Sequence, residues 1–294
     1  MRKSPQSKKL TGSILANHVL PTPGSDGDKE ARGRVLVVGG EASLPGAVIL
    51  AGTAALRAGA GKLQLASVAS VSTAIGVAVP EAMSIGLRET NGAIHPSAAR
   101  ALREHVASTD ALLIGPGTRQ RRSNVWLVQS LLDLPTEAAI VLDAAALEVL
   151  RENFGALGNH EGNTVLTPHS GEMAMMLSIK EEAVIAGAAH IAVDAAAAFG
   201  AVVALKGPTT FIASPTGELF RYESGDVGLA TSGSGDTLAG IIAALLARGA
   251  DPLTATLWGV HLHGEAGNAL AARVGRIGYL ARELLDEIPR LMRS

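Results

Sequence analysis

The chain has 294 residues, of which 47% are hydrophobic, and it contains no cysteine. The absence of cysteine excludes disulfide bonds, thiol nucleophiles and cysteine-bound metals, and it fits a reducing cytoplasm. Lys and Arg (25) nearly balance Asp and Glu (27), so the net charge of -2 provides no attraction to nucleic acid or an anionic membrane. We therefore expect a cytoplasmic protein with no nucleic-acid or membrane partner and one large α/β domain.

The first 31 residues differ in composition from the rest. They are polar and rich in proline and glycine, most of all over residues 21–28. We interpret residues 1–31 as an N-terminal arm and residues 32–294 as a single domain. The basic start lacks the unbroken apolar run of a signal peptide. The alanine-rich stretch 183–200 is interrupted by His190 and Asp194, so it is too short and polar to span a bilayer.

From residue 34 onward, short apolar runs alternate with helical patterns. The runs predict buried strands at 34–39, 62–66, 110–115, 139–143, 164–166 and 202–205. Helices are predicted at 47–58, 96–106, 124–132 and 145–151. Strands that alternate with helices make right-handed crossovers. The sequence therefore predicts a three-layer α/β fold, with a mostly parallel central sheet and helices on both faces.

After residue 205 the pattern changes. Residues 209–213 and 218–222 flank a Ser-Pro-Thr-Gly turn and predict an antiparallel hairpin. Three helices are expected after it, at 235–248, 252–272 and 278–291.

Glycine and polar residues gather where the predicted strands end. These segments are 39–47, 115–117, Asp143, 167–172 and 206–210. In an open α/β sheet, ligands bind outside the carboxyl ends of the strands. The G-x-G-x-x-G and G-x-x-x-x-G-K-[ST] motifs are both absent, which disfavours a Rossmann dehydrogenase and a P-loop NTPase.

Residues 230–240 form the most informative segment, because a glycine-rich turn with one carboxylate runs into a long apolar helix. A helix N-terminus carries about half a positive charge, and glycines let backbone N–H groups approach an anion closely. Asp236 in such a cradle is a candidate base for a hydroxyl that attacks a phosphate. The alternative is an ordinary first-turn acid that stabilises the helix.

Two groups of histidines carry different expectations. His261 and His263 lie with Glu265 on one predicted helix, where residues two apart point to different faces, so we favour a structural role over a metal site. His169 follows a proline at a strand end, and we favour a ligand-binding role for it.

Taken together, the motifs resemble the ribokinase-like superfamily and, within it, the ATP- or ADP-dependent NAD(P)H-hydrate dehydratases. The resemblance covers roughly residues 33 to 291. It rests on the motif around Asp236 and on the segments 45–47, 58–61, 115–117, 167–172, 206–207 and 261–264.

This resemblance implies a repair reaction on the S epimer of hydrated NADH or NADPH. ADP or ATP, with Mg²⁺, phosphorylates the ring hydroxyl, and loss of phosphate restores the dinucleotide. Asp236 would be the catalytic base and would contact the substrate, and Glu172 would act through Mg²⁺ and water; no direct metal ligand is assigned. The other substrate-binding residues would be Ala47, Gly117 and His169. The nucleotide-binding residues would be Lys206, Gly207, Pro208, Thr209, Thr210 and Gly235.

Three positions depart from the family pattern. Ala145 stands where a second aspartate is usual, Leu44 where an aromatic is common, and Asp226 where asparagine is usual. One alternative is a small-molecule kinase of the hydroxyethylthiazole or hydroxymethylpyrimidine type, and another is a nucleotide-binding regulator without turnover. The small-residue helix faces would allow a homo-oligomer, with a tetramer as one form.

Overall fold

The structure is a computed structural model that describes residues 5–22, 29–223 and 225–293. Its strands are β1 (Lys8–Lys9), β2 (Arg34–Val38), β3 (Lys62–Val68), β4 (Met83–Leu87), β5 (Glu89–Thr90), β6 (Ala93–Ile94), β7 (Ala111–Ile114), β8 (Ala139–Leu142), β9 (Thr164–Leu166), β10 (Val202–Leu205), β11 (Thr210–Ala213) and β12 (Leu219–Tyr222). In the described part of the chain, ten strands form one sheet in the order β1-β12-β11-β10-β9-β8-β7-β2-β3-β4. Strands β5 and β6 form a separate antiparallel hairpin.

Helices connect most of the strands. The α-helices are α1 (Gly12–Leu15), α2 (Gly46–Arg57), α3 (Ala69–Ala78), α4 (Arg103–Ala107), α5 (Arg122–Leu132), α6 (Glu148–Glu152), α7 (Ser170–Leu177), α8 (Glu181–Ala186), α9 (Ala188–Phe199), α10 (Ser234–Ala247), α11 (Pro252–Arg273) and α12 (Ala281–Leu291). Short 3-10 helices are η1 (Glu30–Arg32), η2 (Pro96–Leu102), η3 (Ala144–Leu147), η4 (Gly158–His160) and η5 (Val227–Leu229).

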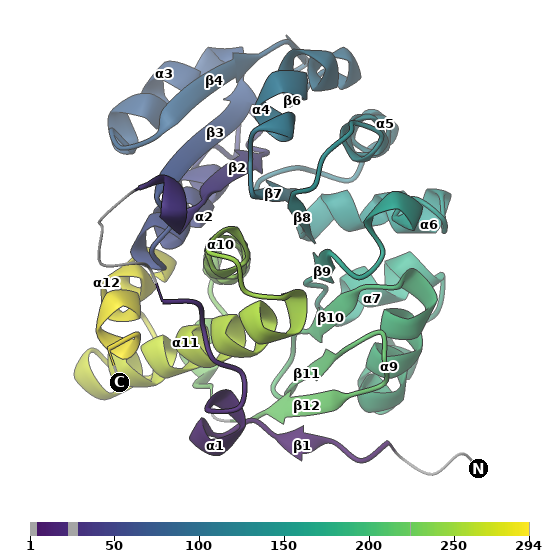
Figure 1. Ribbon diagram of the computed structural model, residues 1–294, viewed down its shortest axis with the longest axis vertical. Coiled ribbons are helices and arrows are strands. Elements are labelled where there is room, and N and C mark those ends of the chain that lie inside the picture. The colour runs from purple at the N-terminus through teal and green to yellow at the C-terminus, as the bar shows by residue number, and fades with distance from the viewer. Residues whose placement is uncertain (1–4, 23–28, 224, 294) are drawn as a thin grey trace.

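Helices cover both faces of the sheet, because the central strands carry apolar side chains on both faces. Val35 and Val37 of β2 belong to one buried cluster, and Leu36 and Val38 belong to the other. Helices α2, α10, α11 and α12 cover the first face, and α5, α6, α7 and α9 cover the second (Figure 1). The expected three-layer α/β fold with a mostly parallel sheet is confirmed.

The strand order reverses between β2 and β7. From β2 the chain builds outward through β3 and β4, and then returns to the other side of β2 and continues through β7, β8, β9 and β10. All of these strands are parallel, so their carboxyl ends lie at one edge of the sheet. Such a reversal leaves a crevice at that edge, which is where ligands bind in open α/β sheets.

Helix α10 packs closely against α2. A Cβ on Gly240 would lie 2.1 Å from the carbonyl oxygen of Ala51, so glycine is required for this backbone approach. The residues from Thr237 to Ala247 are buried without exception. The helix is therefore fixed across the sheet by its apolar sides, and its first turn is held at the carboxyl edge.

The predicted strands and the antiparallel hairpin are confirmed, but several expectations need correction. The segments 96–106 and 145–151 each begin as a 3-10 helix, η2 and η3, before an α-helical turn. The last helix starts at Ala281 instead of 278, because Gly278 has φ +105°, outside the helical region. Strand β4 was not predicted, since Met83 is exposed and the strand lacks an apolar run.

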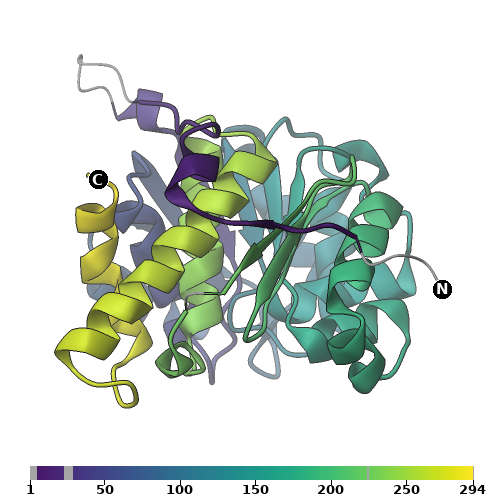
Figure 2. The same cartoon turned by 90° about the horizontal axis from the view of Figure 1, so that it is seen from below.

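Part of the N-terminal arm joins the sheet. Lys8 and Lys9 form a parallel edge strand beside β12, and Leu10 and Leu15 are buried in the core on the α11 side. Figure 2 shows this segment passing across α11 and along β12. The arm residues 1–4 and 23–28 lie outside the described residues, and the proposed boundary at residue 32 stays a prediction. Among the described helices, none has both the length and the apolar character needed to cross a membrane.

The buried part of the arm should contribute to stability. Leu15 is 2% exposed, so Leu15→Ala should lower the free energy of unfolding by about 2–5 kcal/mol through lost burial and a residual cavity. Val19 is 74% exposed and serves as the control, since Val19→Ala should leave stability nearly unchanged. Denaturant unfolding of both variants is the measurement. Equal unfolding midpoints would show that the arm does not stabilise the domain.

Candidate active site

Asp236 lies in the first turn of α10, at the carboxyl edge of the sheet. Gly233, just before this helix, has φ +88°, and a Cβ there would lie 2.4 Å from Leu50 Cδ1, so the turn requires glycine. The Oγ of Ser234 lies 2.9 Å from His263 Nε2, which ties the turn to α11. The N–H of Ser234 donates to Thr231 O over 3.2 Å, and the next N–H groups of the first turn, which have no intrahelical acceptor, are available to an anion.

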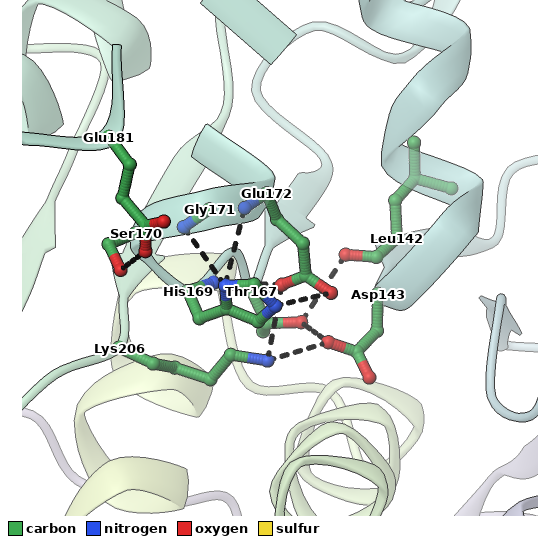
Figure 3. A network of polar contacts seen from close by, with 9 residues as sticks. All are labelled: Leu142, Asp143, Thr167, His169, Ser170, Gly171, Glu172, Glu181 and Lys206. Carbon is green, nitrogen blue, oxygen red and sulfur yellow. Dashed lines mark hydrogen bonds and ion pairs between the residues drawn. The ribbon is translucent and has the colours of Figure 1, made fainter. Parts of the chain in front are cut away.

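Lys206 and Asp143 form a partly buried ion pair beside this turn (Figure 3). Lys206 Nζ donates to Asp143 Oδ1 over 3.0 Å, and Thr167 Oγ1 donates to the same oxygen over 2.7 Å. Asp143 is only 2% exposed. The three residues follow β10, β8 and β9, which are neighbours in the sheet, so parallel pairing brings them together.

Glu172 brings a second carboxylate to Lys206, over 3.8 Å between Oε2 and Nζ. It is oriented by a capping box at the start of α7: the backbone N–H of His169 donates to Glu172 Oε2 over 2.8 Å. His169 Nδ1 in turn accepts from the backbone N–H groups of Gly171 and Glu172, over 3.0 and 3.3 Å. The imidazole of His169 therefore caps the helix, and 58% of this side chain is still exposed.

Burial and neighbouring charges set the protonation of these groups. Burial, assisted by the charges of Asp143 and Glu172 and opposed by Lys206, raises the pKa of Asp236 to about 7. Burial also raises the pKa of Glu172. Burial acts to lower the pKa of Lys206, but Asp143 and Glu172 outweigh it, so the pKa is raised and the ammonium stays charged. A carboxyl group with a pKa near neutrality is suited to accept a proton from a substrate hydroxyl.

The expected substrate-binding residues Ala47 and Gly117 meet at the strand-order reversal. Gly117 has φ +68°, and a Cβ on it would lie 2.9 Å from Ala47 Cβ. The loops after β2 and β7 are joined by backbone hydrogen bonds, from Gly40 N to Pro116 O (2.8 Å) and from Glu41 N to Gly117 O (3.0 Å). Both residues therefore lie at the carboxyl edge of the sheet, where the strand order reverses.

Two of the expected nucleotide-binding residues, Lys206 and Gly235, are close neighbours. A Cβ on Gly235 would be 3.4 Å from Lys206 Nζ, so the ammonium lies against the opening turn of α10. Gly207 and Pro208 are exposed in the loop after Lys206, Thr209 precedes β11, and Thr210 is its first residue. Lys206 also forms an isolated parallel bridge with His169, so residues expected to bind different ligands are direct neighbours.

Residues 35–290 match the sequence profile of the NAD(P)H-hydrate dehydratase family. The chain belongs to this family. It is 47% identical over 289 residues to an ADP-dependent (S)-NAD(P)H-hydrate dehydratase of Xanthomonas campestris, an alignment that covers 98% of this chain and 97% of the relative.

Solved structures agree with this membership. An ADP/ATP-dependent NAD(P)H-hydrate dehydratase of Bacillus subtilis, co-crystallised with ATP and Mg²⁺, superposes with a TM-score of 0.82 and 28% identity, covering 100% of this chain and 99% of the other. A hydroxyethylthiazole kinase of Pyrococcus horikoshii superposes with a TM-score of 0.59 and 22% identity over 89% of each chain, which shows a shared fold. The fold is ribokinase-like.

The histidines on α11 contact neighbouring side chains, and the structural role expected for them stays a prediction. His263 is buried, and desolvation by burial lowers its pKa to about 4, so it is neutral beside Ser234. His261 packs edge-on against Tyr222 and Trp258. Glu265 accepts a hydrogen bond from the Tyr222 hydroxyl over 2.8 Å. The described residues contain no group of three His, Cys, Asp or Glu side chains placed to bind a metal.

The positions that depart from the family pattern are accommodated locally. Ala145 is buried, and its carbonyl accepts from Asn124 Nδ2 over 3.0 Å. Asp226 caps η5 through Gly228 N (3.1 Å) and accepts from Arg276 Nε (3.0 Å). The Leu44 side chain is 39% exposed beside the loop that holds Gly117.

The sequence did not predict a role for two residues of this network, Asp143 and Thr167. Both follow predicted strands directly, so their place at the carboxyl edge was foreseeable. Their shared contact with Lys206 depends on the order of β8, β9 and β10, which the local sequence does not specify.

Removing the charge of Asp143 should make Asp236 a stronger acid. Asp143→Asn keeps an oxygen that can accept from Thr167 and Lys206, but it removes a charge that raises the pKa of Asp236. We expect the pKa of Asp236 to fall below about 7. Carbon NMR titration of the Asp236 carboxyl in both proteins is the measurement, with the exposed Asp194→Asn as control. An unchanged or higher pKa would contradict this electrostatic assignment.

Proposed function

We propose that the protein is an ADP- or ATP-dependent (S)-NAD(P)H-hydrate dehydratase that repairs hydrated NADH and NADPH. The observation that carries this proposal is Asp236, a carboxyl with a pKa of about 7 at the start of α10, next to the ammonium of Lys206. A base and a cationic cradle side by side suit phosphoryl transfer to a hydroxyl. Family membership supplies the substrate class.

In the first step, ionised Asp236 accepts the proton of the ring hydroxyl while the hydroxyl oxygen attacks the terminal phosphorus of the nucleotide. The bond from that phosphorus to the bridging oxygen breaks, and the shortened nucleotide leaves. The N–H groups at the start of α10 and Lys206 face the charge that develops on the transferred group. The main contribution of the protein is to position Asp236, the ring hydroxyl and the terminal phosphate relative to one another.

In the second step, the lone pair of the ring nitrogen expels phosphate from the adjacent carbon. The next ring carbon then loses a proton, and the double bond of the dihydronicotinamide re-forms. Phosphorylation is needed because hydroxide is a poor leaving group and phosphate a good one. The overall change converts hydrated dinucleotide and nucleotide into dinucleotide, shortened nucleotide and phosphate.

The donor set fits Mg²⁺ that arrives with the nucleotide. Magnesium in such sites is bound by one or two carboxylates together with substrate phosphates, so a cage of three acidic side chains is not required. Glu172, beside Lys206, would hold the ion, which would neutralise phosphate charge.

Within this proposal Ala47, Gly117 and His169 bind the hydrated dinucleotide, while Gly235 and residues 206–210 bind the nucleotide. Ala47 and Gly117 support this assignment by their place at the reversal between β2 and β7, whereas His169 pairs with Lys206, so the two sets adjoin at the end of β10. The cytoplasmic location and the homo-oligomeric state expected from the sequence stay predictions.

The competing small-molecule kinase would share Asp236 and stop at the phosphoester. Incubation with hydrated NADH, ATP or ADP and Mg²⁺ separates the two, because only the dehydratase restores the absorbance of reduced nicotinamide. A stable phosphorylated product without this absorbance would favour the kinase.

Asp236→Asn should fold and bind nucleotide but lose about 10²–10⁴-fold in kcat, the usual effect of losing a general base. Initial-rate kinetics and calorimetric titration with ATP are the measurements. Asp194→Asn, an exposed residue on α9, is the matched control and should keep full activity. Activity of Asp236→Asn within a few-fold of the wild type would rule out the base role.

Only the S epimer should be consumed. A hydroxyl on the opposite ring face is displaced by about 2 Å or more, beyond hydrogen-bond reach of a carboxylate fixed on α10. An epimer mixture should therefore react to a plateau set by the S fraction, apart from slow spontaneous epimerisation. Chromatography during the reaction follows each epimer. Equal initial rates for both would contradict a single fixed base.

A further inference from the structure

A hollow of about 350 Å³ lies between the β5–β6 hairpin and the start of α5. We call it the α5 hollow. Its lining includes Thr90, Ile94, His95, Pro96, Arg121 and Trp126. Small-molecule sites have volumes of about 300–1,000 Å³ and combine apolar walls with a few polar groups. None of these residues takes part in the chemistry described above.

The hollow combines an aromatic surface with a neighbouring cationic side chain. Trp126 is 53% exposed, although large aromatic side chains are normally buried. The guanidinium of Arg122 lies 5.2 Å from the centre of its ring. Arg121 is a lining residue, and its side chain is 34% exposed. An exposed ring of this kind can stack on a nucleobase, and an arginine can bind a phosphate.

Arg121 is fixed in place by a buried acid. Arg121 Nη2 donates to Glu41 Oε2 over 2.7 Å, and the backbone N–H of Arg119 donates to Glu41 Oε1 over 3.1 Å. The Glu41 side chain is only 5% exposed. A buried carboxylate held by two donors keeps the arginine in one position without covering all of its donors.

The same acid connects the α5 hollow to the crevice. The backbone N–H of Glu41 donates to Gly117 O, and the N–H of Ala42 donates to Gly92 O in the β5–β6 turn. Gly117 and Arg121 are four residues apart, so their Cα atoms lie within about 14 Å of each other. A hydrated dinucleotide has two nucleotide halves joined by a pyrophosphate, and only one half reacts at Asp236. The other half must lie elsewhere along this edge.

We propose that the α5 hollow binds the adenosine phosphate half of the hydrated dinucleotide, with the adenine stacked on Trp126 and a phosphate bound by Arg121. This assignment rests on the proposed function and extends it. The reacting half then lies in the crevice between Gly117 and Asp236, and the phosphoryl donor occupies the separate region around Lys206. The site contributes binding energy away from the reaction, so it acts on substrate affinity more than on the chemical step.

The test compares two substrates in the Trp126→Ala variant. Hydrated NADH has the adenosine phosphate half, whereas the hydrated form of reduced nicotinamide mononucleotide lacks it. We expect the variant to raise KM for hydrated NADH about tenfold, the effect of losing one stacked base, with kcat and KM for ATP unchanged. For the mononucleotide, wild type and variant should be equal. Phe154→Ala, which removes a 59% exposed aromatic outside the hollow, is the control and should change neither KM.

Direct binding gives a second readout. The chain has two tryptophans, so Trp258→Phe leaves Trp126 as the single reporter, and Trp126→Phe leaves Trp258. With the donor site saturated by a non-hydrolysable ATP analogue, NADP⁺ should quench Trp126 fluorescence and leave Trp258 unaffected. Binding of NADP⁺ seen by calorimetry without quenching of Trp126 would overturn the proposal.

The outcomes separate the two levels of inference. If the wild type restores neither dinucleotide nor mononucleotide, the proposed function fails and this site fails with it. If the wild type is active but Trp126→Ala has an unchanged KM for hydrated NADH, the adenosine site alone is wrong. Equal losses on both substrates, with a changed oligomeric state, would assign the α5 hollow to a subunit contact and also overturn the proposal.

Discussion

The chemistry of the site depends on three carboxyl groups that share one ammonium. Lys206 lies 3.0 Å from Asp143 and 3.8 Å from Glu172, and it is the cation that lowers the pKa of Asp236. One positive charge cannot neutralise three acids that are buried or partly buried, so at least one of them retains its proton more readily than in water. In these contacts Lys206 forms ion pairs with Asp143 and Glu172 but not with Asp236. Asp236 is therefore the group left with a pKa near neutrality, which a proton acceptor needs.

The fold brings these groups together from distant parts of the chain. Asp143, Thr167 and Lys206 span more than sixty residues, yet they follow three adjacent parallel strands. The fourth group, Asp236, reaches the same edge because α10 is buried from Thr237 to Ala247 and packs closely against α2 where Gly240 meets Ala51. Rigid elements hold each charged atom, so little reorganisation is needed when substrate arrives.

The sequence predicted the central elements well because their signals are local. Apolar runs mark β2, β7 and β8, and the glycine-rich turn marks the start of α10. Strand β4 escaped detection because an edge strand with Met83 exposed lacks such a run. The sequence could not show that Lys206 contacts Asp143, since that depends on strand order. The cap formed by His169 was also hidden, because a histidine is not among the usual N-cap residues.

The raised pKa of Asp236 also links function to stability. In the unfolded chain this carboxyl titrates near 3.8, whereas in the folded protein it titrates at about 7. The folded state thus binds the proton more tightly, and stability from this group is fully present below pH 3.8 and is lost as the pH rises to about 7. Above that pH the ionised, catalytically useful form is the destabilising one. The apolar burial of α10 offsets this cost, because the residues from Thr237 onward belong to the core and Gly240 packs against Ala51.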